Sequence, residues 1–334
     1  MVAKSQLLVK EAYRFSVAPM LDCTDKHFRV LMRQISRRAL LYTEMIVAKA
    51  LIHTPHKGYF LDFNPIENPV ALQLGGDDPK LLSEAVKLAE EWGYDEVNLN
   101  IGCPSPKVKA GNFGACLMAN PAHVAKCVEA MTSKSQLPIT VKHRLGIDDL
   151  DTDELLLKFV DQVASAGAQR FVVHARKAWL EGLNPKQNRT IPPLQYDRVR
   201  NLKKVRPKLK IELNGGLNHP NDCLEALKTF DGTMVGRAAY SHPLRWQQID
   251  EIIFGETAKF INASKVIRGL IPHAQKHIER GGKIWDFCRH ILQLVEEVPG
   301  ARIWRKNLCF AAQHKNKDIK VLETAAQQLE DAGL

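Results

Sequence analysis

One of the seven cysteines in the sequence occupies an unusual position for a structural residue. Cys103 stands in the segment NLNIGCP, residues 98–104, where a strand-like run ends. Gly102 and Pro104 flank it, and both residue types interrupt regular structure, so the thiol is expected on a loop and not inside an element. A thiol presented in this way can act as a nucleophile or as an acid, or it can be an ordinary small residue.

Other residues that can do chemistry stand at the ends of short apolar segments elsewhere in the chain. They are Glu44, Gln73, Asn98 and Asn100, Lys142 and Arg144, His174 and Arg176, Asn214, and Arg237. A single polar residue can simply mark the end of a strand. So many segments ending in this way indicate that their ends meet in one place, where the chemistry would be done.

The apolar segments themselves predict the scaffold that positions these residues. Eight stretches rich in Val, Ile, Leu or Phe begin 22 to 42 residues apart, at 15–21, 40–46, 69–75, 96–102, 138–144, 170–176, 210–216 and 232–238. Eight strand–helix units in about 250 residues predict an α/β fold, a TIM (β/α)8 barrel whose strand ends form one mouth. An open doubly wound sheet is the alternative, but VAPMLD and not GxGxxG follows the start of the first segment.

Helix signals separate most of the predicted strands. The expected starts are Asp78-Pro79, Asn120-Pro121, Asp151 and His219-Pro220. The second unit is the least clear, because HTPHKGYFLDFNP (53–65) has no clean period. After about residue 256 the pattern changes to four amphipathic helices without strands, over 267–281, 283–298, 301–314 and 319–333. We therefore predict a barrel domain over residues 1–255 and a small all-α helical bundle over 256–334.

Glycines near the last two predicted strands favour a ligand that carries phosphate. Gly215-Gly216 follows the seventh segment and Gly236-Arg237 lies in the eighth, where barrels commonly bind phosphate through backbone N–H groups. Flavin mononucleotide is such a ligand, and Lys142 and His174 would face it from the fifth and sixth strands. A barrel lysine can also form a Schiff base, and a histidine can be a core residue. His143 is expected on the opposite face of its strand, in a structural role.

Composition and cysteine spacing limit the compartment and the metal chemistry. No stretch of about 18 apolar residues occurs, and residues 1–15 lack the apolar run of a signal peptide, so we expect a soluble, cytoplasmic protein without membrane contact. The cysteines form no CxxC pair, which indicates reduced thiols. His273 and His277 are spaced for a metal, but without a third ligand we expect them to face solvent or RNA and predict no metal site.

The net charge of +10 is unevenly distributed along the chain. Residues 176–210 carry eleven Lys or Arg against two Asp or Glu. Clustered positive charge favours a polyanionic partner, and nucleic acid is the first candidate.

Taken together, these motifs resemble those of the A-type tRNA-dihydrouridine synthases. The resemblance rests on APML (18–21), QLGG (73–76), NLNIGCPSPKVKAGNFGACLM (98–118), TVKHRLGID (140–148), VVHARKAWLEGLNPKQNR (172–189), ELNGG (212–216) and MVGRAAY (234–240). It runs from about residue 13 to the final helices. In that family an FMN-containing barrel, reduced by NADPH, saturates the 5,6 double bond of uridines 20 and 20a in the tRNA D-loop. The resemblance thus implies a flavin-dependent oxidoreductase. We expect it to be a monomer, and NADH is an alternative reductant because the sequence has no dinucleotide-binding fingerprint.

The resemblance also implies roles for individual residues. The FMN ligands would be Ala18, Pro19, Met20, Gln73, Lys142, His174, Asn214, Gly215, Gly216, Gly236 and Arg237. Cys103 would give a proton to C5 while reduced flavin delivers hydride to C6, and Asn100 would contact the target uridine. The tRNA-binding residues would be Lys186, Arg189, Arg302 and Arg305. One departure is Cys23, where the family leads us to expect tryptophan.

Three other functions are compatible with parts of this pattern. A flavin barrel that reduces a free small molecule shares the cofactor and the cysteine, but it would not need the basic stretch or the helical bundle. An aldolase or isomerase barrel could use Lys142 as its nucleophile and would be colourless. A non-catalytic RNA-binding protein accounts for the charge but leaves the residues at the strand ends without a role.

Overall fold

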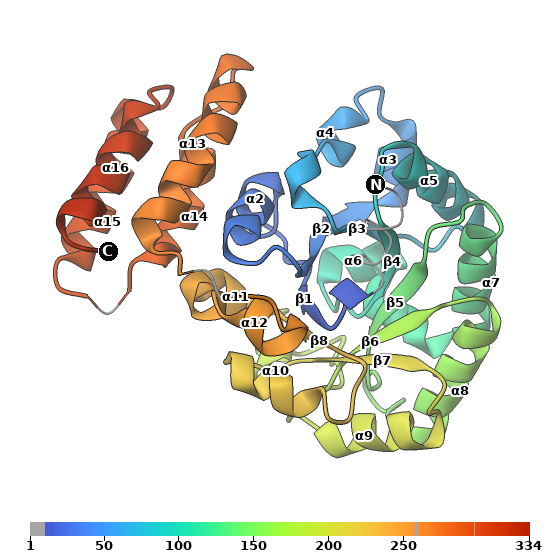
Figure 1. Ribbon diagram of the computed structural model, residues 1–334. Helices are drawn as coiled ribbons and strands as arrows, with labels where there is room; N and C mark the ends of the chain where they lie inside the picture. The colour runs from blue at the N-terminus through green and yellow to red at the C-terminus, as the bar shows by residue number, and fades with distance from the viewer. Residues whose placement is uncertain (1–10, 258–259, 297) are drawn as a thin grey trace.

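The computed structural model describes residues 11–257, 260–296 and 298–334. Eight parallel strands close into a barrel in chain order, and β8 pairs with β1 (Figure 1). The strands are β1 Phe15–Val17, β2 Leu40–Val47, β3 Val70–Gly75, β4 Glu96–Ile101, β5 Ile139–Arg144, β6 Arg170–His174, β7 Lys210–Asn214 and β8 Gly232–Val235. The predicted TIM barrel is confirmed, and each strand lies within its predicted segment or within one residue of it.

Helices cover the outside of the barrel. They are α2 Lys26–Ile35, α3 Ala48–His53, α4 Gly58–Leu61, α5 Pro79–Glu91, α7 Pro121–Thr132, α8 Asp153–Ser165, α9 Tyr196–Val205, α10 Pro220–Ala226, α11 Arg237–Ser241 and α12 Ile249–Phe254, with the short elements η1 Pro65–Glu67, α6 Pro106–Ala110, η2 Gly114–Ala119, η3 Gln187–Arg189 and η4 Pro243–Trp246. The unclear second unit contains only short helices between β2 and β3.

The predicted helix starts hold with one exception. Asp78 accepts hydrogen bonds from two backbone N–H groups at the start of α5, and Asn120 does the same for one at the start of α7. The expectation for Asp151 is wrong, because Thr152 caps α8 and accepts from the Leu155 N–H. Asp151 instead pairs with Arg198, with its Oδ1 2.6 Å from Nη1.

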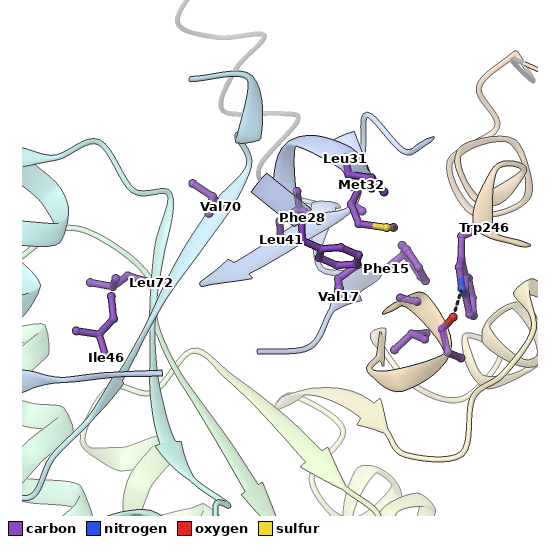
Figure 2. Packing of buried hydrophobic residues seen from close by; sticks show 14 of the residues in the cluster. Phe15, Val17, Phe28, Leu31, Met32, Leu41, Ile46, Val70, Leu72 and Trp246 are labelled. Atoms are coloured by element: carbon purple, nitrogen blue, oxygen red, sulfur yellow. Dashed lines mark hydrogen bonds between the residues drawn. The ribbon is translucent and has the colours of Figure 1, made fainter. Parts of the chain in front are cut away.

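Alternation along each strand separates two environments. On β4, Val97, Leu99 and Ile101 are buried in the large core between the strands and the surrounding helices. The alternate residues point into the barrel. Where β1 meets β8, the rings of Phe15 and Trp246 stack with centroids 5.3 Å apart, and the Trp246 indole donates to the Ala238 carbonyl at 3.2 Å (Figure 2). This contact covers the point at which the sheet closes.

The barrel interior contains charged side chains near the amino-terminal ends of the strands. Arg170 Nη2 lies 2.7 Å from Glu96 Oε2 and Arg170 Nε lies 3.0 Å from Glu212 Oε2, with all three side chains no more than 6% exposed. Tyr42 donates to Glu96 at 2.9 Å, and its oxygen accepts from Arg170 at 3.1 Å. Burial raises the pKa of Glu212 to about 7, while Arg170 opposes this shift. One guanidinium thus joins β4 and β6 to β7 across the barrel.

The chain after α12 is helical, as predicted. It forms α13 Ala263–Glu279, α14 Trp285–Ile291, η5 Leu292–Leu294, α15 Ala301–His314 and α16 Lys320–Asp331. These helices lie to one side of the barrel, and α13 and α14 pack against α2 (Figure 1). The division of the chain into a barrel domain and a helical domain at residue 255 remains a prediction. Residues 1–10, 258–259 and 297, which the predicted domains include, lie outside the described residues. Among the described helices, none is long and apolar enough to cross a membrane.

The ion pairs of Arg170 predict that replacing this residue destabilises the folded protein strongly. In the variant Arg170→Met, Glu96 and Glu212 remain buried without a counter-charge, and the free energy of unfolding is expected to fall by about 3–5 kcal/mol in urea titrations. Arg206→Met is the matched control, because Arg206 pairs with Asp161 at the surface. That variant should lose about 1 kcal/mol or less. Equal losses in the two variants would contradict the assigned importance of Arg170.

Candidate active site

The carboxyl ends of the strands bring the predicted site residues together. Strand register places Gln73 beside Asn98, Asn100 beside Lys142, and His174 beside Asn214. These residues belong to β3, β4, β5, β6 and β7 and share the face that points into the barrel. The prediction that residues scattered in the sequence meet at one mouth is confirmed for this set.

The loop after β4 holds Cys103 at the rim of this mouth. The thiol-bearing residue is half-buried, and the Asn100 Oδ1 accepts hydrogen bonds from the backbone N–H groups of Gly102 at 3.1 Å and Cys103 at 3.0 Å. On the other side, the Cys103 carbonyl accepts from the Ala115 N–H at 2.9 Å. Gly114 allows this approach, because a Cβ there would lie 2.7 Å from the Cys103 carbonyl oxygen.

A ladder of side-chain amides connects this loop to the barrel interior. Asn100 Nδ2 donates to Gln73 Oε1 at 2.9 Å, and Gln73 Nε2 donates to Asn98 Oδ1 at 2.8 Å. Asn98 Nδ2 then donates to Thr140 Oγ1 at 2.9 Å, and that hydroxyl donates to Glu96 at 2.6 Å. The Glu96 carboxylate can only accept, so the Thr140 hydroxyl must donate to it. This determines, one amide after another, which end of each amide side chain donates and which accepts.

Lys142 lies at the centre of the mouth on β5. Its Nζ donates to Asn214 Oδ1 at 2.9 Å, and Asn214 Nδ2 donates to the Met234 carbonyl at 2.8 Å. Burial, with a further contribution from the charge of Arg144, lowers the pKa of Lys142 to about 8. The ammonium form is still favoured at pH 7, and its remaining N–H donors are available to an anion or a carbonyl oxygen.

His174 follows on β6 and is a neutral imidazole at pH 7. Burial holds its pKa well below the usual range, and the positive charges of Arg144 and Lys142 add to the effect. A Cβ on Gly215 would lie 2.8 Å from His174 Cδ2, so only glycine lets the β7 loop pass this ring.

Glycine-containing turns after β7 and β8 form a cradle for an anion. Gly215 and Gly216 both have positive φ, at 108° and 76°. The backbone N–H groups of Gly215, Gly216 and Gly236 donate to no backbone carbonyl in the turns and loops of the described residues. Arg237 uses one Nη2 for the Arg189 carbonyl at 3.2 Å, which leaves most of its donors free. Free backbone donors beside a guanidinium fit a phosphate group.

The first loop closes the cradle from the β1 side. Ala18 and Met20 face Gly236, since a Cβ there would be 3.6 Å from both the Ala18 Cβ and the Met20 Sδ. Pro19 lies between them. Together the donors fit FMN: a cation and a neutral imidazole for its ring, and the glycines with Arg237 for its phosphate.

Sequence comparison identifies the family to which this arrangement belongs. The family model described as "Dihydrouridine synthase (Dus)" matches residues 16–330. The chain is a member of the dihydrouridine synthase family. Members of this family are in general flavin-dependent.

Three named relatives match along nearly their whole length, and each is called "tRNA-dihydrouridine(20/20a) synthase". The relative from Synechocystis is 49% identical over 312 residues, 93% of each chain. The one from Escherichia coli O6:H1 is 47% identical over 324 residues, 97% of each chain. The one from Salmonella typhimurium is 46% identical over 332 residues, 99% of each chain.

Arg144 is a residue of this dihydrouridine synthase site to which sequence reasoning gave no individual role. Its Nε donates to the Gly102 carbonyl at 2.9 Å, and its Nη1 donates to the carbonyls of Lys177 and Asn188, each at 3.0 Å. The Cys103 loop and the loop after β6 are thus attached to one buried guanidinium. Its place at a strand end was the only signal in the sequence, because the acceptors are backbone atoms distant along the chain.

The four predicted tRNA-binding residues lie on two separate elements. Lys186 and Arg189 are exposed on the loop after β6, and Arg189 is close enough to Cys103 for their charges to interact. Arg302 is exposed on α15, whereas Arg305 is half-buried and donates to the Val295 carbonyl at 2.9 Å. Arg189 therefore belongs to the mouth, and Arg302 belongs to the outer face of the helical region.

The basic stretch 176–210 is less available to a polyanion than its charge count indicates. Arg198 pairs with Asp151 and Asp153, each at 2.6 Å. The other pairs within this stretch are Lys177 with Asp151, Arg200 with Asp197, Lys203 with Asp231, and Arg206 with Asp161. Five of the eleven basic residues are therefore neutralised in ion pairs, and the carboxylates that pair with them come mostly from other parts of the sequence. Lys186 and Arg189 take part in none of the ion pairs among the described residues, so the predicted polyanionic partner is left to residues such as these.

The hydrogen bonds of Asn100 predict how the Cys103 loop responds to a substitution. In Asn100→Ala the loop loses two hydrogen bonds, and the alkylation rate of Cys103 by iodoacetamide should rise about 30-fold, since each hydrogen bond contributes about 1 kcal/mol and about 1.4 kcal/mol is a factor of ten. Mass spectrometry of the Cys103 peptide measures this rate. Asn184→Ala, which removes a hydrogen bond from an exposed turn, should leave the rate unchanged. An unchanged rate in Asn100→Ala would show that the loop is held by other contacts.

Proposed function

We propose that this protein reduces the 5,6 double bond of uridines 20 and 20a in the tRNA D-loop, using FMN as cofactor and NADPH as reductant. The observation that carries the proposal is a thiol held at the rim of the same barrel mouth that contains Lys142 and the glycine cradle. Family membership and relatives named for this activity over nearly the full chain support it.

The residues of the mouth would hold the cofactor. They are Ala18, Pro19, Met20, Gln73, Lys142, His174, Asn214, Gly215, Gly216, Gly236 and Arg237. Lys142 would lie near the edge of the flavin ring that becomes negative on reduction, and the cradle would receive the phosphate. When bound in its reduced form, FMN supplies the hydride for C6 of the uracil ring.

Cys103 would supply the proton. Reduction of a carbon–carbon double bond needs a hydride on one carbon and a proton on its neighbour, and the Cys103 thiol would protonate C5 as a general acid. The thiolate that remains would face the guanidinium groups of Arg144 and Arg189, whose charges interact with this residue. Solvent would then return a proton to the sulfur.

Asn100 would position this acid and contact the target base. Its Oδ1 already holds the backbone of the Cys103 loop, so the base would be placed by the same side chain that orients the thiol. A uridine that is stacked on its neighbours would have to turn out of the stack to reach the mouth.

The helical region would bind the rest of the tRNA. Arg302, Lys306 and Phe310 follow one another at intervals of four on α15, and all three are exposed. A stripe of cations with one aromatic ring suits phosphates and an unpaired base. Lys186 and Arg189 would add contacts nearer the mouth, and Arg305 would add one on α15. Residues 256–334 would form the tRNA-binding domain. We also propose that the enzyme is a monomer and that it is located in the cytoplasm.

An anaerobic spectroscopic titration tests the function. The purified protein is expected to be yellow, to bleach on addition of NADPH and to regain its colour with unmodified tRNA transcript. Free uracil or orotate should not restore the colour. A yellow protein indifferent to tRNA would indicate a reductase of small molecules. A colourless protein that FMN cannot reconstitute would leave Lys142, with its lowered pKa, as the nucleophile of an aldolase.

The variant Cys103→Ala separates the two half-reactions. Reduction of the bound flavin by NADPH should proceed at the wild-type rate, whereas reoxidation by tRNA should slow by about 10²–10⁴-fold, the usual contribution of a general acid. Stopped-flow absorbance measures both rates. Cys309→Ala, a half-buried cysteine on α15, is the control and should change neither. If both half-reactions of Cys103→Ala slowed equally, the assignment of Cys103 as the acid would be wrong.

The exposed stripe on α15 predicts a salt-dependent effect on tRNA binding. Arg302→Ala should weaken binding and reduce the slope of log Kd against log salt concentration by about 1, as expected for one lost phosphate contact. Filter binding at several salt concentrations provides the slope. Arg268→Ala is the control, because Arg268 pairs with Glu330 at 2.8 Å. A slope unchanged by Arg302→Ala would remove this residue from the interface.

A further inference from the structure

Three histidines and an aspartate gather where the helical region meets the barrel. His27 lies on α2, His273 and His277 lie one turn apart on α13, and Asp286 lies on α14. His27 is buried, whereas the side chains of His277 and Asp286 are 20% and 38% exposed. The expectation that His273 and His277 face solvent or RNA is wrong. Both contact α2, which supplies the third candidate ligand that the sequence pattern lacked.

The ligand atoms are close enough for one small metal ion. One nitrogen or oxygen from each of His27, His277 and Asp286 lies within 4.8 Å of the other two. His277 Nε2 and Asp286 Oδ2 are 2.8 Å apart. A tetrahedral Zn²⁺ with bonds of about 2.0–2.2 Å keeps its ligand atoms about 3.4 Å apart. Side-chain rotations that move these atoms by about an ångström would therefore complete the site.

His273 is placed to orient the His27 ring. His273 Nε2 lies 3.2 Å from His27 Nδ1, which leaves the other nitrogen of His27 for an ion. Hydrogen bonds of this kind commonly fix the ring of a metal-binding histidine. The Phe287 ring covers His27 from one side, with centroids 4.4 Å apart.

The surroundings of His277 also fit a ligand position. Gly282 leaves space for the His277 ring, because a Cβ there would lie 2.1 Å from His277 Nε2. The nearby Asp25 is already engaged by the start of α2, by Arg289 and by His290. Asp286 uses only its Oδ2, which lies beside His277 and accepts from the Lys283 N–H, so its Oδ1 is left without a partner among the described residues.

We propose that His27, His277 and Asp286 bind one Zn²⁺, with water as the fourth ligand on the exposed side. Imidazole and carboxylate ligands suit zinc. The three ligands come from α2, α13 and α14, so the ion fastens the C-terminal helices to the barrel. This site lies apart from the residues proposed to do chemistry, and its test does not depend on them.

The test uses the full-length, tag-free protein with its bound cofactor, stripped of metal by a chelator and then given ZnCl2. One equivalent should bind, and the melting temperature should rise by about 5 °C at a hundredfold excess over Kd. X-ray absorption at the zinc edge should show nitrogen and oxygen ligands with imidazole features. Sulfur ligands would place the ion on a cysteine and overturn the proposal, as would no thermal shift. This spectrum requires no variant, so it stays decisive if a variant fails to fold.

Substitutions locate the ion within the cluster. His277→Gln and Asp286→Asn, both at the exposed side of the site, should each weaken zinc binding at least about tenfold, the usual cost of a lost ligand or its support. His314→Gln, a histidine on α15 outside the cluster, is the matched control and should bind as the wild type does. Wild-type affinity in both cluster variants would overturn the assignment.

Discussion

The buried guanidinium of Arg170 is the interaction on which the barrel interior depends. Most TIM barrels fill their interior with branched apolar side chains. Here a cation on β6 lies between Glu96 on β4 and Glu212 on β7. A charge in such a place is stable only with complete pairing, because desolvation costs several kcal/mol per ion. The geometry of three strands is therefore set by one residue.

The amide ladder above this ion pair has no freedom of its own. An isolated asparagine or glutamine amide can be reversed with little cost, but Glu96 can only accept, so Thr140 must donate to it. Each amide above then has one allowed direction, up to Asn100. The Asn100 amide thus presents its oxygen to the Cys103 loop because of the Glu96 carboxylate. This carboxylate lies deep in the barrel, where no substrate would touch it.

The sequence predicted local structure well and tertiary pairing less well. Strand segments and most helix caps depend on neighbouring residues, so Asp78 and Asn120 could be identified directly. Asp151 could not, because Arg198, which binds it, comes from a helix more than forty residues later. The same reason explains why the ion pairs of the basic stretch 176–210 could not be predicted, since most of its carboxylate partners are distant along the chain.

The candidate site shows the same division. Types and order of the residues at strand ends predicted the mouth and its glycine cradle, because parallel strands must bring those ends together. The packing of His273 and His277 against His27 could not be predicted, because the contact of α13 with α2 joins residues about 246 positions apart. Contacts between backbone carbonyls and side chains, such as those of Arg144, leave no pattern in a single sequence.

The three carbonyls held by Arg144 have a consequence for how this protein can change. One belongs to the loop of Cys103, and the others belong to the loop that carries Lys186 and Arg189. An insertion or deletion in the loop after β6 would shift the Cys103 loop as well, because Arg144 is bonded to both loops. With the roles proposed for Cys103, Lys186 and Arg189, tRNA preference and placement of the acid would not be separate traits in this barrel. A change in one loop during divergence would then require compensation in the other.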